Sequence, residues 1–219
     1  MIKLLAAVVR RENISHGELV KVWEEVHAPH VVKIIKPERY RITFFDEQAT
    51  PDDPGYDGMA ELWFRDKDHF NNGIGRNAPA EVMDDHFSDY ADLTKGIWLP
   101  VVEHINVDGP ITRDTTKLVY FVKRRPSTER SHLDVYWINT HVPNVVSAFG
   151  RSPQAKRYTV DLVDLSNSTK TQPYDGIAQI CMEGDNPRFA DMNDYEPDGF
   201  ADLVEPMLIA RGHEVCIIS

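Results

Sequence analysis

The chain carries the same segment twice. Residues 1–32 realign without a gap on residues 115–146, and the identities between the two segments include residue types that rarely coincide by chance. A repeat of this length exceeds a solenoid unit and approaches the size of a small domain, so the sequence indicates a tandem duplication of one domain. The identical pairs include Trp23 and Trp137, His27 and His141, and Pro29 and Pro143.

Further matches extend the repeat toward the end of each copy. The segment YDGMA at residues 56–60 answers YDGIA at residues 174–178. Later matches are the tripeptide Ala-Asp-Leu at residues 91–93 and 201–203, and His104 with His213. The segment DGPITRD between the copies has the glycine and proline typical of a connection. We therefore expect a first repeat at residues 1–107, a linker at residues 108–114 and a second repeat at residues 115–219.

Each copy has the same order of predicted elements. A continuous apolar run predicts a buried strand, and a segment with apolar residues at helical spacing follows it. Two strands, a second helical region and a last strand complete each copy, which is the βαββαβ order of a ferredoxin-like fold. The predicted strands span residues 2–9, 39–45, 59–64 and 99–107 in the first copy, and 118–122, 157–165, 177–182 and 210–218 in the second.

The predicted helices carry recognisable end signals. Ser15 and Glu18 form a capping-box pattern ahead of the first helix. Pro29 and Pro143 lie where each first helix is expected to end, because proline disfavours continuation of a helix. The second helical region is expected from Pro79 onward in the first copy and, in the second copy, around Pro187, Phe189, Met192 and Phe200.

The expected fold class is α+β. A four-stranded sheet with helices on one face needs cover on its other face, and the predicted strands look apolar on both faces. We expect the two ferredoxin-like βαββαβ repeats to pack sheet to sheet as a pseudo-dimeric α+β barrel, with the helices outside. One chain would then imitate a dimer.

Composition restricts the partners and the compartment. The net charge is −11, which argues against a nucleic acid or an anionic membrane as partner. No apolar run reaches the length of a membrane span, and the first apolar run precedes its basic pair, unlike a signal peptide. The two cysteines, Cys181 and Cys216, do not form a disulfide framework. A cytoplasmic protein is expected.

The repeated motifs resemble one known family. They are the basic pair after the first strand, the W-x-x-x-H-x-P stretch at residues 23–29 and 137–143, and YDGMAELWF at residues 56–64. In combination they resemble the EthD family of the dimeric α+β barrel superfamily, and the resemblance covers nearly the whole chain in two copies.

The resemblance implies a broad range of activities. EthD-like proteins and their relatives include cofactor-independent oxygenases of polyketide phenols, dehydratases and cyclases of aromatic polyketides, and an isomerase of methyl-substituted muconolactones. The substrate pocket of the superfamily usually lies between the sheet and the helices of each repeat. The family usually pairs single-repeat chains, whereas this chain carries both repeats; a homodimer of the two-repeat chain is a further expectation.

Three residues are candidates for catalysis: His27, Glu61 and His104. His27 lies four residues after Trp23, on the face of the helix that the pattern buries, and a histidine can act as general base or acid. The alternative is a core histidine that holds the helix end. Glu61 interrupts an apolar strand, where a carboxylate needs a partner or a polar cavity; a salt bridge to Arg10, Arg11 or Arg39 is the alternative. His104 on the last strand could face His27 across one pocket or lie at the surface.

Aromatic residues near these positions are candidates for substrate binding. Tyr40 and Tyr158 begin the second strand of each copy, where they could pack or orient a substrate. The second copy has Gln179 and Cys181 in place of Glu61 and Trp63, so if one repeat has lost its chemistry, the second is the better candidate. The expected substrate-binding residues are Trp23, Tyr40, Trp63, Trp137, His141 and Tyr158.

The sequence offers little for a metal or an organic cofactor. It has neither a cysteine cluster nor an H-E-x-x-H pattern, and no G-x-G-x-x-G follows a strand. We expect no metal and no cofactor. The basic pairs Arg10-Arg11 and Arg124-Arg125 are interpreted first as solvated strand ends and second as anion anchors at a pocket mouth.

Three hypotheses are compatible with this pattern: an enzyme with two candidate chemistries, a binding protein and a structural remnant. The first is a cofactor-independent enzyme that acts on a small aromatic, polyketide-like or lactone substrate through histidine-based proton transfer, giving isomerisation, elimination or cyclisation. Cofactor-free monooxygenation of a phenolic substrate begins with the same deprotonation and is the second chemistry. A small-molecule binding protein without turnover is the next alternative, and a remnant that supports only assembly is the last.

Overall fold

The computed structural model describes residues 1–47, 52–112, 114–167, 171–184 and 196–219. The chain divides into two compact units, each described here by itself. Within the described residues, unit 1 comprises residues 1–47, 55–101 and 214–219, and unit 2 comprises residues 52–54 and the described part of 102–213. The strands β4 (Ile97–Asp108) and β8 (Leu208–Ile218) therefore each begin in one unit and end in the other.

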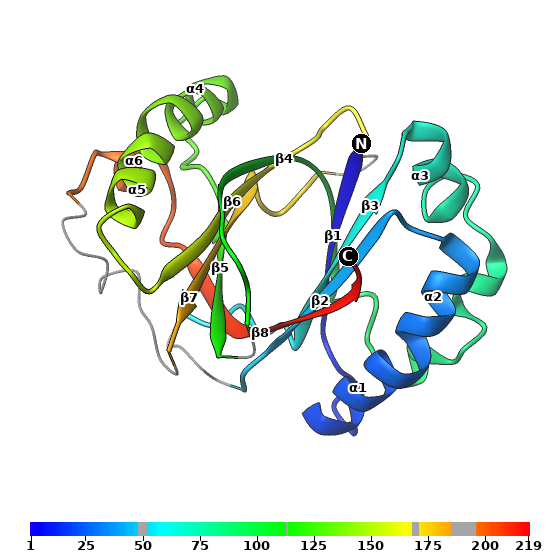
Figure 1. Cartoon of the computed structure of the whole chain (residues 1–219). Helices are drawn as coiled ribbons and strands as arrows, with labels where there is room; N and C mark the ends of the chain where they lie inside the picture. Colours follow the sequence, from blue (N-terminus) through cyan, green and yellow to red (C-terminus); the bar gives the residue numbers. More distant parts are fainter. Residues whose placement is uncertain (48–51, 113, 168–170, 185–195) are drawn as a thin grey trace. The chain divides into compact units, whose positions relative to one another are not determined.

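Unit 1 has a sheet with helices on one face (Figure 1). β1 lies between β3 and β4 and runs antiparallel to both, and β3 also pairs with β2. The strand order β4-β1-β3-β2 is that of a ferredoxin-like sheet, and the end of β8 neighbours β2. The remaining elements are β1 (Ile2–Val8), α1 (His16–Val22), η1 (Trp23–His27), α2 (Ala28–Ile35), β2 (Arg39–Phe45), β3 (Gly58–Phe64), α3 (Lys67–Gly73), η2 (Ala80–Met83) and η3 (Phe87–Asp89).

Unit 2 repeats this arrangement. β5 lies between β7 and β8, antiparallel to both, and β7 pairs with β6, while the end of β4 neighbours β6. The expected βαββαβ order is confirmed in both copies. The elements are β5 (Thr115–Val122), α4 (Arg130–Tyr136), η4 (Trp137–His141), α5 (Val142–Phe149), β6 (Ala155–Val163), β7 (Gly176–Glu183) and α6 (Phe200–Leu203).

The first helix of each unit continues through its proline. The predicted capping box is confirmed, because the Ser15 side chain accepts a hydrogen bond from the backbone N–H of Glu18 and the Glu18 carboxylate accepts one from the backbone N–H of Ser15. The expectation that Pro29 ends the helix is wrong, since α2 extends to Ile35. A π-helical turn, η1, precedes the proline and widens the helix there. Proline cannot donate a backbone hydrogen bond, and this irregular turn accommodates it.

The second helical region of unit 1 is much less regular than its sequence pattern predicts. Beyond Pro79 the chain forms only the short 3₁₀ turns η2 and η3 instead of one helix. In unit 2, α6 is a helix of 4 residues, and the predicted positions Pro187, Phe189 and Met192 lie outside the described residues.

The two faces of each sheet differ in polarity, contrary to the expectation of two apolar faces. Leu4, Ala6 and Val8 of β1 face the helices and join the core cluster of unit 1. The alternate side of the same sheet carries Lys3 and Glu61, which are 2% exposed and form an ion pair of 2.8 Å. The sequence does not show that these two charged residues share one face, because the strands are buried on both sides.

Strand register also corrects one match between the copies. Val101 pairs with Lys3 in unit 1, and Gly212 pairs with Lys117 in unit 2, so Val101 and Gly212 are equivalent. His104 is therefore three residues beyond this point and His213 only one, and the two histidines do not correspond.

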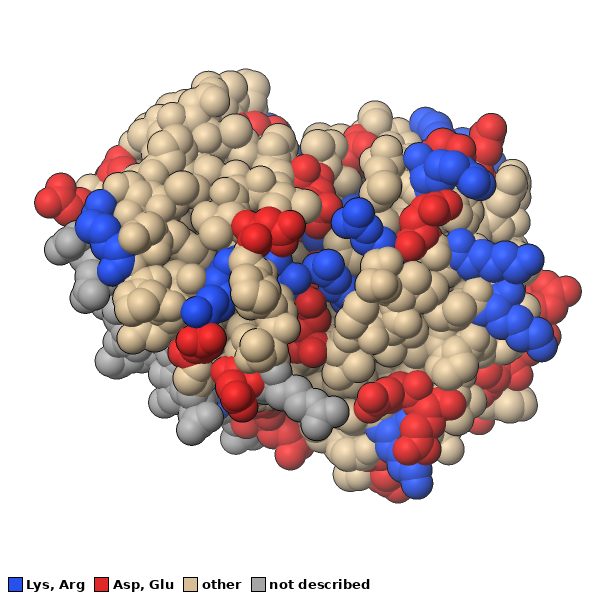
Figure 2. All heavy atoms as spheres, viewed as in Figure 1, with Lys and Arg blue, Asp and Glu red and all other residues tan. Residues whose placement is uncertain are grey.

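On the face drawn in Figure 2, acidic and basic side chains are interspersed. No helix within the described residues combines the length and the apolar character that a membrane crossing would need.

Candidate functional site

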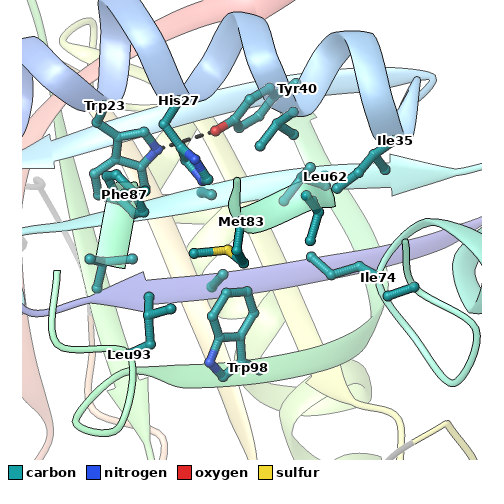
Figure 3. Close-up of a pocket in the computed structure, with 16 residues that line it drawn as sticks. Trp23, His27, Ile35, Tyr40, Leu62, Ile74, Met83, Phe87, Leu93 and Trp98 are labelled. Carbon is teal, nitrogen blue, oxygen red and sulfur yellow. Dashed lines mark hydrogen bonds between the residues drawn. The ribbon is translucent and has the colours of Figure 1, made fainter. Parts of the chain in front are cut away.

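A cavity of about 290 Å³ lies between the sheet and the helices of unit 1, where the family resemblance places a pocket (Figure 3). Its wall is mainly aliphatic and aromatic, and among the described residues neither lysine nor arginine lines it. The polar atoms come from a few side chains. The residues that matter below are Trp23, His27, Tyr40, Met83, Phe87 and Trp98.

His27 is the histidine that lines this cavity. It ends the π-helical turn η1, and its Nδ1 lies 2.7 Å from Oδ2 of Asp85. A carboxylate can only accept at this distance, so Nδ1 carries the proton and Nε2 carries the lone pair. Within the described residues this is the ring's one hydrogen bond, and the ring extends from its helix toward the cavity (Figure 3).

Phe87 and Asp85 together fix the ring of His27. The Phe87 ring stacks on the imidazole with centroids 3.9 Å apart and planes 7° from parallel. The backbone N–H of Phe87 donates to Oδ1 of Asp85 at 3.1 Å, which leaves Oδ2 for the histidine. The imidazole is therefore restrained by a flat contact on its face and by a hydrogen bond at its edge.

The protonation of His27 reflects two opposing influences. Burial lowers the pKa of His27 below its usual value, because a charged imidazolium loses hydration, while the hydrogen bond and charge of Asp85 partly restore it. His30 adds a smaller lowering effect. A histidine with a lowered pKa is neutral near pH 7 and can accept a proton.

Trp23 and Tyr40 form the polar pair beside this histidine. The indole Nε1–H of Trp23 donates to the Tyr40 hydroxyl at 3.2 Å, and both side chains are 1% exposed. Burial raises the pKa of Tyr40 far above its usual value, so the phenol stays protonated. Tyr40 can therefore donate a hydrogen bond to a ligand, or it can serve in packing alone.

The repeated sequence motifs act as the scaffold of this site. Arg10 donates from its backbone N–H and its guanidinium to the Asp57 carboxylate, at 2.7 and 2.5 Å. Arg11 donates to the carbonyl of Ser88 at 2.6 Å and so holds the loop that carries Asp85 and Phe87. Both arginines of the basic pair therefore bind the protein itself.

Glycine is required next to Asp57. A Cβ at Gly58 would lie 2.9 Å from the carbonyl oxygen of Thr43 and 3.0 Å from Cζ3 of Trp23. The absence of a side chain lets the indole rest directly on β3. The Tyr-Asp-Gly motif therefore joins the strand, the arginine and the tryptophan of the cavity.

Unit 2 holds a second cavity of about 290 Å³ with the same arrangement. His141 Nδ1 lies 2.9 Å from Oδ2 of Asp198, and the Phe200 ring stacks on the imidazole with centroids 4.1 Å apart. Burial lowers the pKa of His141, and Asp198 partly opposes that effect. Arg124 binds Asp175 as Arg10 binds Asp57.

The carboxylate of unit 2 has an extra partner. Nδ2 of Asn144 donates to Oδ2 of Asp198 at 3.0 Å. Burial alone would raise the pKa of Asp198, but hydrogen bonds from Asn144, Phe200 and His141 together lower it below its usual value. Asp198 also lines its cavity, which Asp85 does not do in unit 1.

The structure brings together part of the predicted site. Trp23, His27 and Tyr40 line the cavity of unit 1, and Trp137, His141 and Tyr158 line that of unit 2. Glu61 and Trp63 do not line the cavity, because they lie on the sheet face that carries Lys3. Lys3 lies 4.7 Å above the Trp63 ring, so this face forms a buried charged cluster of its own.

His104 is also absent from the residues that line the cavity beside His27. It lies in the part of β4 that belongs to unit 2, whereas His27 belongs to unit 1. The expected grouping of His27, Glu61 and His104 in one pocket is therefore not found. Alternate residues of a strand point to opposite faces of the sheet, and Glu61 points to the face away from the cavity. His104 lies in the part of β4 that belongs to unit 2.

The sequence analysis missed the two carboxylates that orient the histidines. A signal exists: Asp-x-Phe occurs at residues 85–87 and again at 198–200. The match between residues 91–93 and 201–203 concealed it. The bridge between Arg10 and Ala91 corresponds to that between Arg124 and Val204, so Ala91 is equivalent to Val204 and the earlier match was displaced by three residues.

Within the part of the chain that the structure describes, no group of three or more histidine, cysteine or acidic side chains is placed to hold a metal ion. Both cysteines are free, with Cys181 buried and Cys216 exposed.

Solved structures with similar folds cover all or nearly all of the chain. A candidate monooxygenase from Fusobacterium nucleatum has a TM-score of 0.61 at 9% identity, and the match covers 100% of this chain and 95% of that one. A variant chlorite dismutase from Candidatus Nitrospira defluvii has a TM-score of 0.55 at 9% identity, covering 97% and 91%. At such identities the likeness concerns the fold alone, and it confirms the α+β class of tandem ferredoxin-like repeats.

A search of curated proteins finds no match to the chain. The family model described as EthD domain matches twice, at residues 11–94 and 125–204, which together make up more than half of the chain. Both matches contain the histidine, the aspartate and the stacked phenylalanine of their cavity. The chain belongs to the EthD family, whose domain it carries in two copies.

Proposed function

We propose that the protein is a cofactor-independent enzyme in which His27 transfers a proton to and from a small ring compound held in the cavity of unit 1. One observation carries the proposal: Asp85 holds Nδ1–H of His27, so the lone pair of Nε2 is left for the cavity. A neutral imidazole oriented by a carboxylate is a general base, and the same carboxylate stabilises the imidazolium that forms.

The reaction starts at an acidic C–H or O–H bond of the ligand. Nε2 takes the proton, and the bonding electrons remain on the ligand as an enolate or phenolate. Return of the proton to a different carbon gives isomerisation, and transfer to a departing hydroxide gives loss of water. Attack of the enolate carbon on a second carbonyl gives cyclisation, and the proton then neutralises the new alkoxide.

The cavity restricts the ligand. The described part of its wall offers mainly aliphatic and aromatic side chains and neither lysine nor arginine, so a carboxylate or phosphate on the ligand would meet no counter-ion there. A neutral aromatic, polyketide-like or lactone ring suits this wall, with its acidic proton directed at His27. Trp98, at 38% exposure, stands at the edge of the same cavity.

Two alternatives share the cavity. Cofactor-free oxygenation of a phenol begins with the same proton transfer, and it requires molecular oxygen as co-substrate. Two observations favour a binding protein without turnover. The cavity wall is apolar, and Glu61 lies on the opposite face of the sheet and not among the cavity residues.

Solvent deuterium uptake tests the proposal without knowledge of the product. The protein is incubated in D₂O with 2-tetralone and with lactone and phenolic relatives, and NMR follows replacement of the acidic protons. We expect catalysed exchange that falls at least about 100-fold in His27→Ala, the lower range for a placed general base. His132→Ala, which removes an exposed histidine of α4, is the matched control and should keep the wild-type rate.

Each outcome separates the alternatives. Unchanged exchange in a folded His27→Ala variant contradicts the proposal. Binding of the probes with no catalysed exchange supports the binding protein instead. Consumption of oxygen together with loss of a phenolic substrate supports the oxygenase. The same assay on His141→Ala reports whether unit 2 contributes to turnover.

A further inference from the structure

One residue beside His27 has an unusual backbone conformation. His86 has φ 61° and ψ 21°, in the left-handed region that residues other than glycine rarely enter. Among the residues that the structure describes, the other non-glycine residue with a positive φ is Lys36, which closes α2, and this conformation is common at the end of a helix. His86 closes no helix, because it lies between the short turns η2 and η3, so its conformation needs another reason.

The two neighbours of His86 are the residues that hold the imidazole of His27. Asp85 precedes it and accepts the hydrogen bond from Nδ1, and Phe87 follows it and stacks on the ring (Figure 3). The chain turns tightly between them, because Oδ1 of Asp85 also accepts a hydrogen bond from the backbone N–H of Phe87, two residues further on. An aspartate that bonds the backbone two residues on replaces part of a β-turn. In the type II form of that turn the residue between has φ near about +80° and ψ near about 0°, which favours glycine.

Unit 2 has the same turn with a glycine in the middle. Gly199 has φ 89° and ψ 0°, and it lies between Asp198 and Phe200, which hold His141 in the same manner. The backbone N–H of Phe200 donates to Oδ1 of Asp198 at 3.0 Å. The two copies differ in the middle residue and share its conformation, so the site depends on the backbone there and not on one side chain.

The side chain of His86 supplies no reason for the left-handed conformation. It is 81% exposed, and its Nδ1 lies 3.9 Å from Oδ2 of the equally exposed Asp89. An exposed ion pair of this kind stabilises little. A Cβ on Gly199 would lie 3.4 Å from the Tyr136 hydroxyl, an ordinary contact, so a side chain fits at this position in both units. The restriction is therefore conformational and not one of space.

We propose that His86 is a positioning residue of the His27 site, whose left-handed backbone directs the Asp85 carboxylate and the Phe87 ring onto one imidazole. A residue that disfavours this conformation should loosen the turn whatever its side chain contacts. The inference deepens the proposed function and rests on it for any effect on turnover, but the turn itself can be measured in the protein without a ligand. Unit 1, with histidine where unit 2 has glycine, holds its turn against a conformational cost.

Three substitutions at position 86 separate the backbone from the side chain. His86→Gly, His86→Asn and His86→Val all remove the imidazole of residue 86. Glycine and asparagine enter the left-handed region readily, whereas the β-branched valine does not. Only His86→Val therefore challenges the turn, and the other two variants are its matched controls.

Amide hydrogen exchange measured by NMR reports the turn directly. We expect the N–H of Phe87 to exchange about 5- to 30-fold faster in His86→Val than in His86→Asn, which is the factor that corresponds to the cost of a left-handed residue other than glycine. The N–H of Phe200 makes the equivalent bond in unit 2 and should not change. The reciprocal variant Gly199→Val should accelerate Phe200 and leave Phe87 unchanged.

Two further measurements connect the turn to His27. The Nδ1–H proton of the His27 imidazole should exchange faster in His86→Val than in His86→Asn, because its acceptor Asp85 is held less firmly. In the deuterium-uptake assay His86→Val should be slower than wild type, and His86→Gly and His86→Asn should restore the rate. Absence of turnover in every variant would contradict the proposed function and leave the exchange data to decide on the turn.

Two results would overturn the proposal. One is equal exchange of the Phe87 amide in folded His86→Val and His86→Asn. The other is an acceleration of Phe200 in His86→Val as large as that of Phe87, since this would indicate general destabilisation. If His86→Val does not fold, His86→Ala, a smaller challenge to the same conformation, is compared with His86→Gly at the same two amides.

Discussion

His27 differs from an exposed histidine because burial and Asp85 act on it in opposite directions. Loss of hydration favours the neutral ring, and the carboxylate favours the charged ring. The result is a base that is neutral near pH 7 and whose conjugate acid has a partner 2.7 Å away. The proximity of this one carboxylate, rather than the histidine alone, supports the proposed proton transfer at the cavity.

Replacing Asp85 by asparagine tests that dependence. An amide in Asp85→Asn carries no charge, so the pKa of His27 should fall further and the imidazolium should lose its stabilisation. In the deuterium assay we expect the rate to fall roughly 10-fold or more and the midpoint of the pH–rate profile to move to lower pH. Asp84→Asn, at the exposed neighbour, is the control; a midpoint that moves upward in Asp85→Asn would contradict this account.

Glu61 shows how a residue can look catalytic in sequence and act structurally. It forms an ion pair with Lys3 at 2.8 Å on the sheet face away from the cavity. Breaking a buried pair by removing one partner leaves an uncompensated charge and typically costs about 3–5 kcal/mol. We expect Glu61→Ala to lower the free energy of unfolding in urea by that order.

A second measurement separates the two roles of Glu61. At temperatures where the Glu61→Ala variant is folded, its deuterium exchange should match that of the wild type. A large loss of exchange with undiminished stability would return Glu61 to the catalytic machinery.

At the scale of elements, the repeated motifs position the side chains of the cavity wall. The π-helical turn places Trp23 at its start and His27 at its end, and the arginine pair secures β3 and the loop that brings Asp85. A π-helical turn inside an α-helix is often found at functional sites. The motifs of the family are therefore explained by the geometry of the cavity wall.

Gly58→Ala tests the contact between strand and indole. The new methyl group would meet the Thr43 carbonyl at 2.9 Å and Trp23 at 3.0 Å, and neither neighbour can easily withdraw. Such overpacking typically costs about 1–3 kcal/mol, so thermal unfolding should occur at a lower temperature. Gly17→Ala is the control: nothing lies within 4 Å, and alanine in α1 should stabilise by up to about 1 kcal/mol. Equal melting temperatures for the two variants would contradict the packing described.

The sequence predicts much of the fold and only part of the site. The duplication and the apolar runs are strong signals, and they identify the strands and the first helices correctly. His27 is found because its spacing of four from Trp23 places both on one buried face. A proline inside a helix normally signals the end of that helix, so the sequence predicts an end at Pro29. The π-helical turn, after which the helix continues, is therefore missed.

Asp85 is missed for a different reason. It is 58 residues from His27 and lies between two short 3₁₀ turns, in a region where the sequence pattern predicts one continuous helix. Glu61 is misplaced because a strand buried on both faces does not reveal which side each residue faces. Only the pairing of strands, which the sequence does not specify residue by residue, settles that point.

At the scale of the whole molecule, the duplicated histidines give the protein a common response to acid. The pKa values of His27 and His141 are both lowered, so below pH 6.5 the unfolded chain binds protons that the folded chain does not. This contribution to stability is complete above about pH 6.5 and is lost as the pH falls through the folded-state values.

The double variant His27→Ala/His141→Ala should therefore show a weaker pH dependence. We expect its urea midpoint to fall less than that of the wild type between about pH 6.5 and 5. The lowered pKa of Asp198 concerns more acidic conditions and lies outside this window. An identical pH dependence for both proteins would show that the histidines are not the groups responsible.

Assembly of the two-repeat chain stays a prediction. The sequence leaves a homodimer of this chain open, and sedimentation at several concentrations decides between one and two copies. Neither outcome alters the two cavities, because each is built from residues of a single unit.

The protonation of the His27 ring tests the central claim most directly. Nitrogen-15 NMR of the histidine side chains, titrated from pH 4 to pH 8 and assigned with His27→Ala, reports the tautomer and the pKa of each ring. The account predicts that His27 carries its proton on Nδ1 when neutral and titrates below pH 6.5. A neutral ring protonated on Nε2, or a midpoint above 6.5, would contradict it.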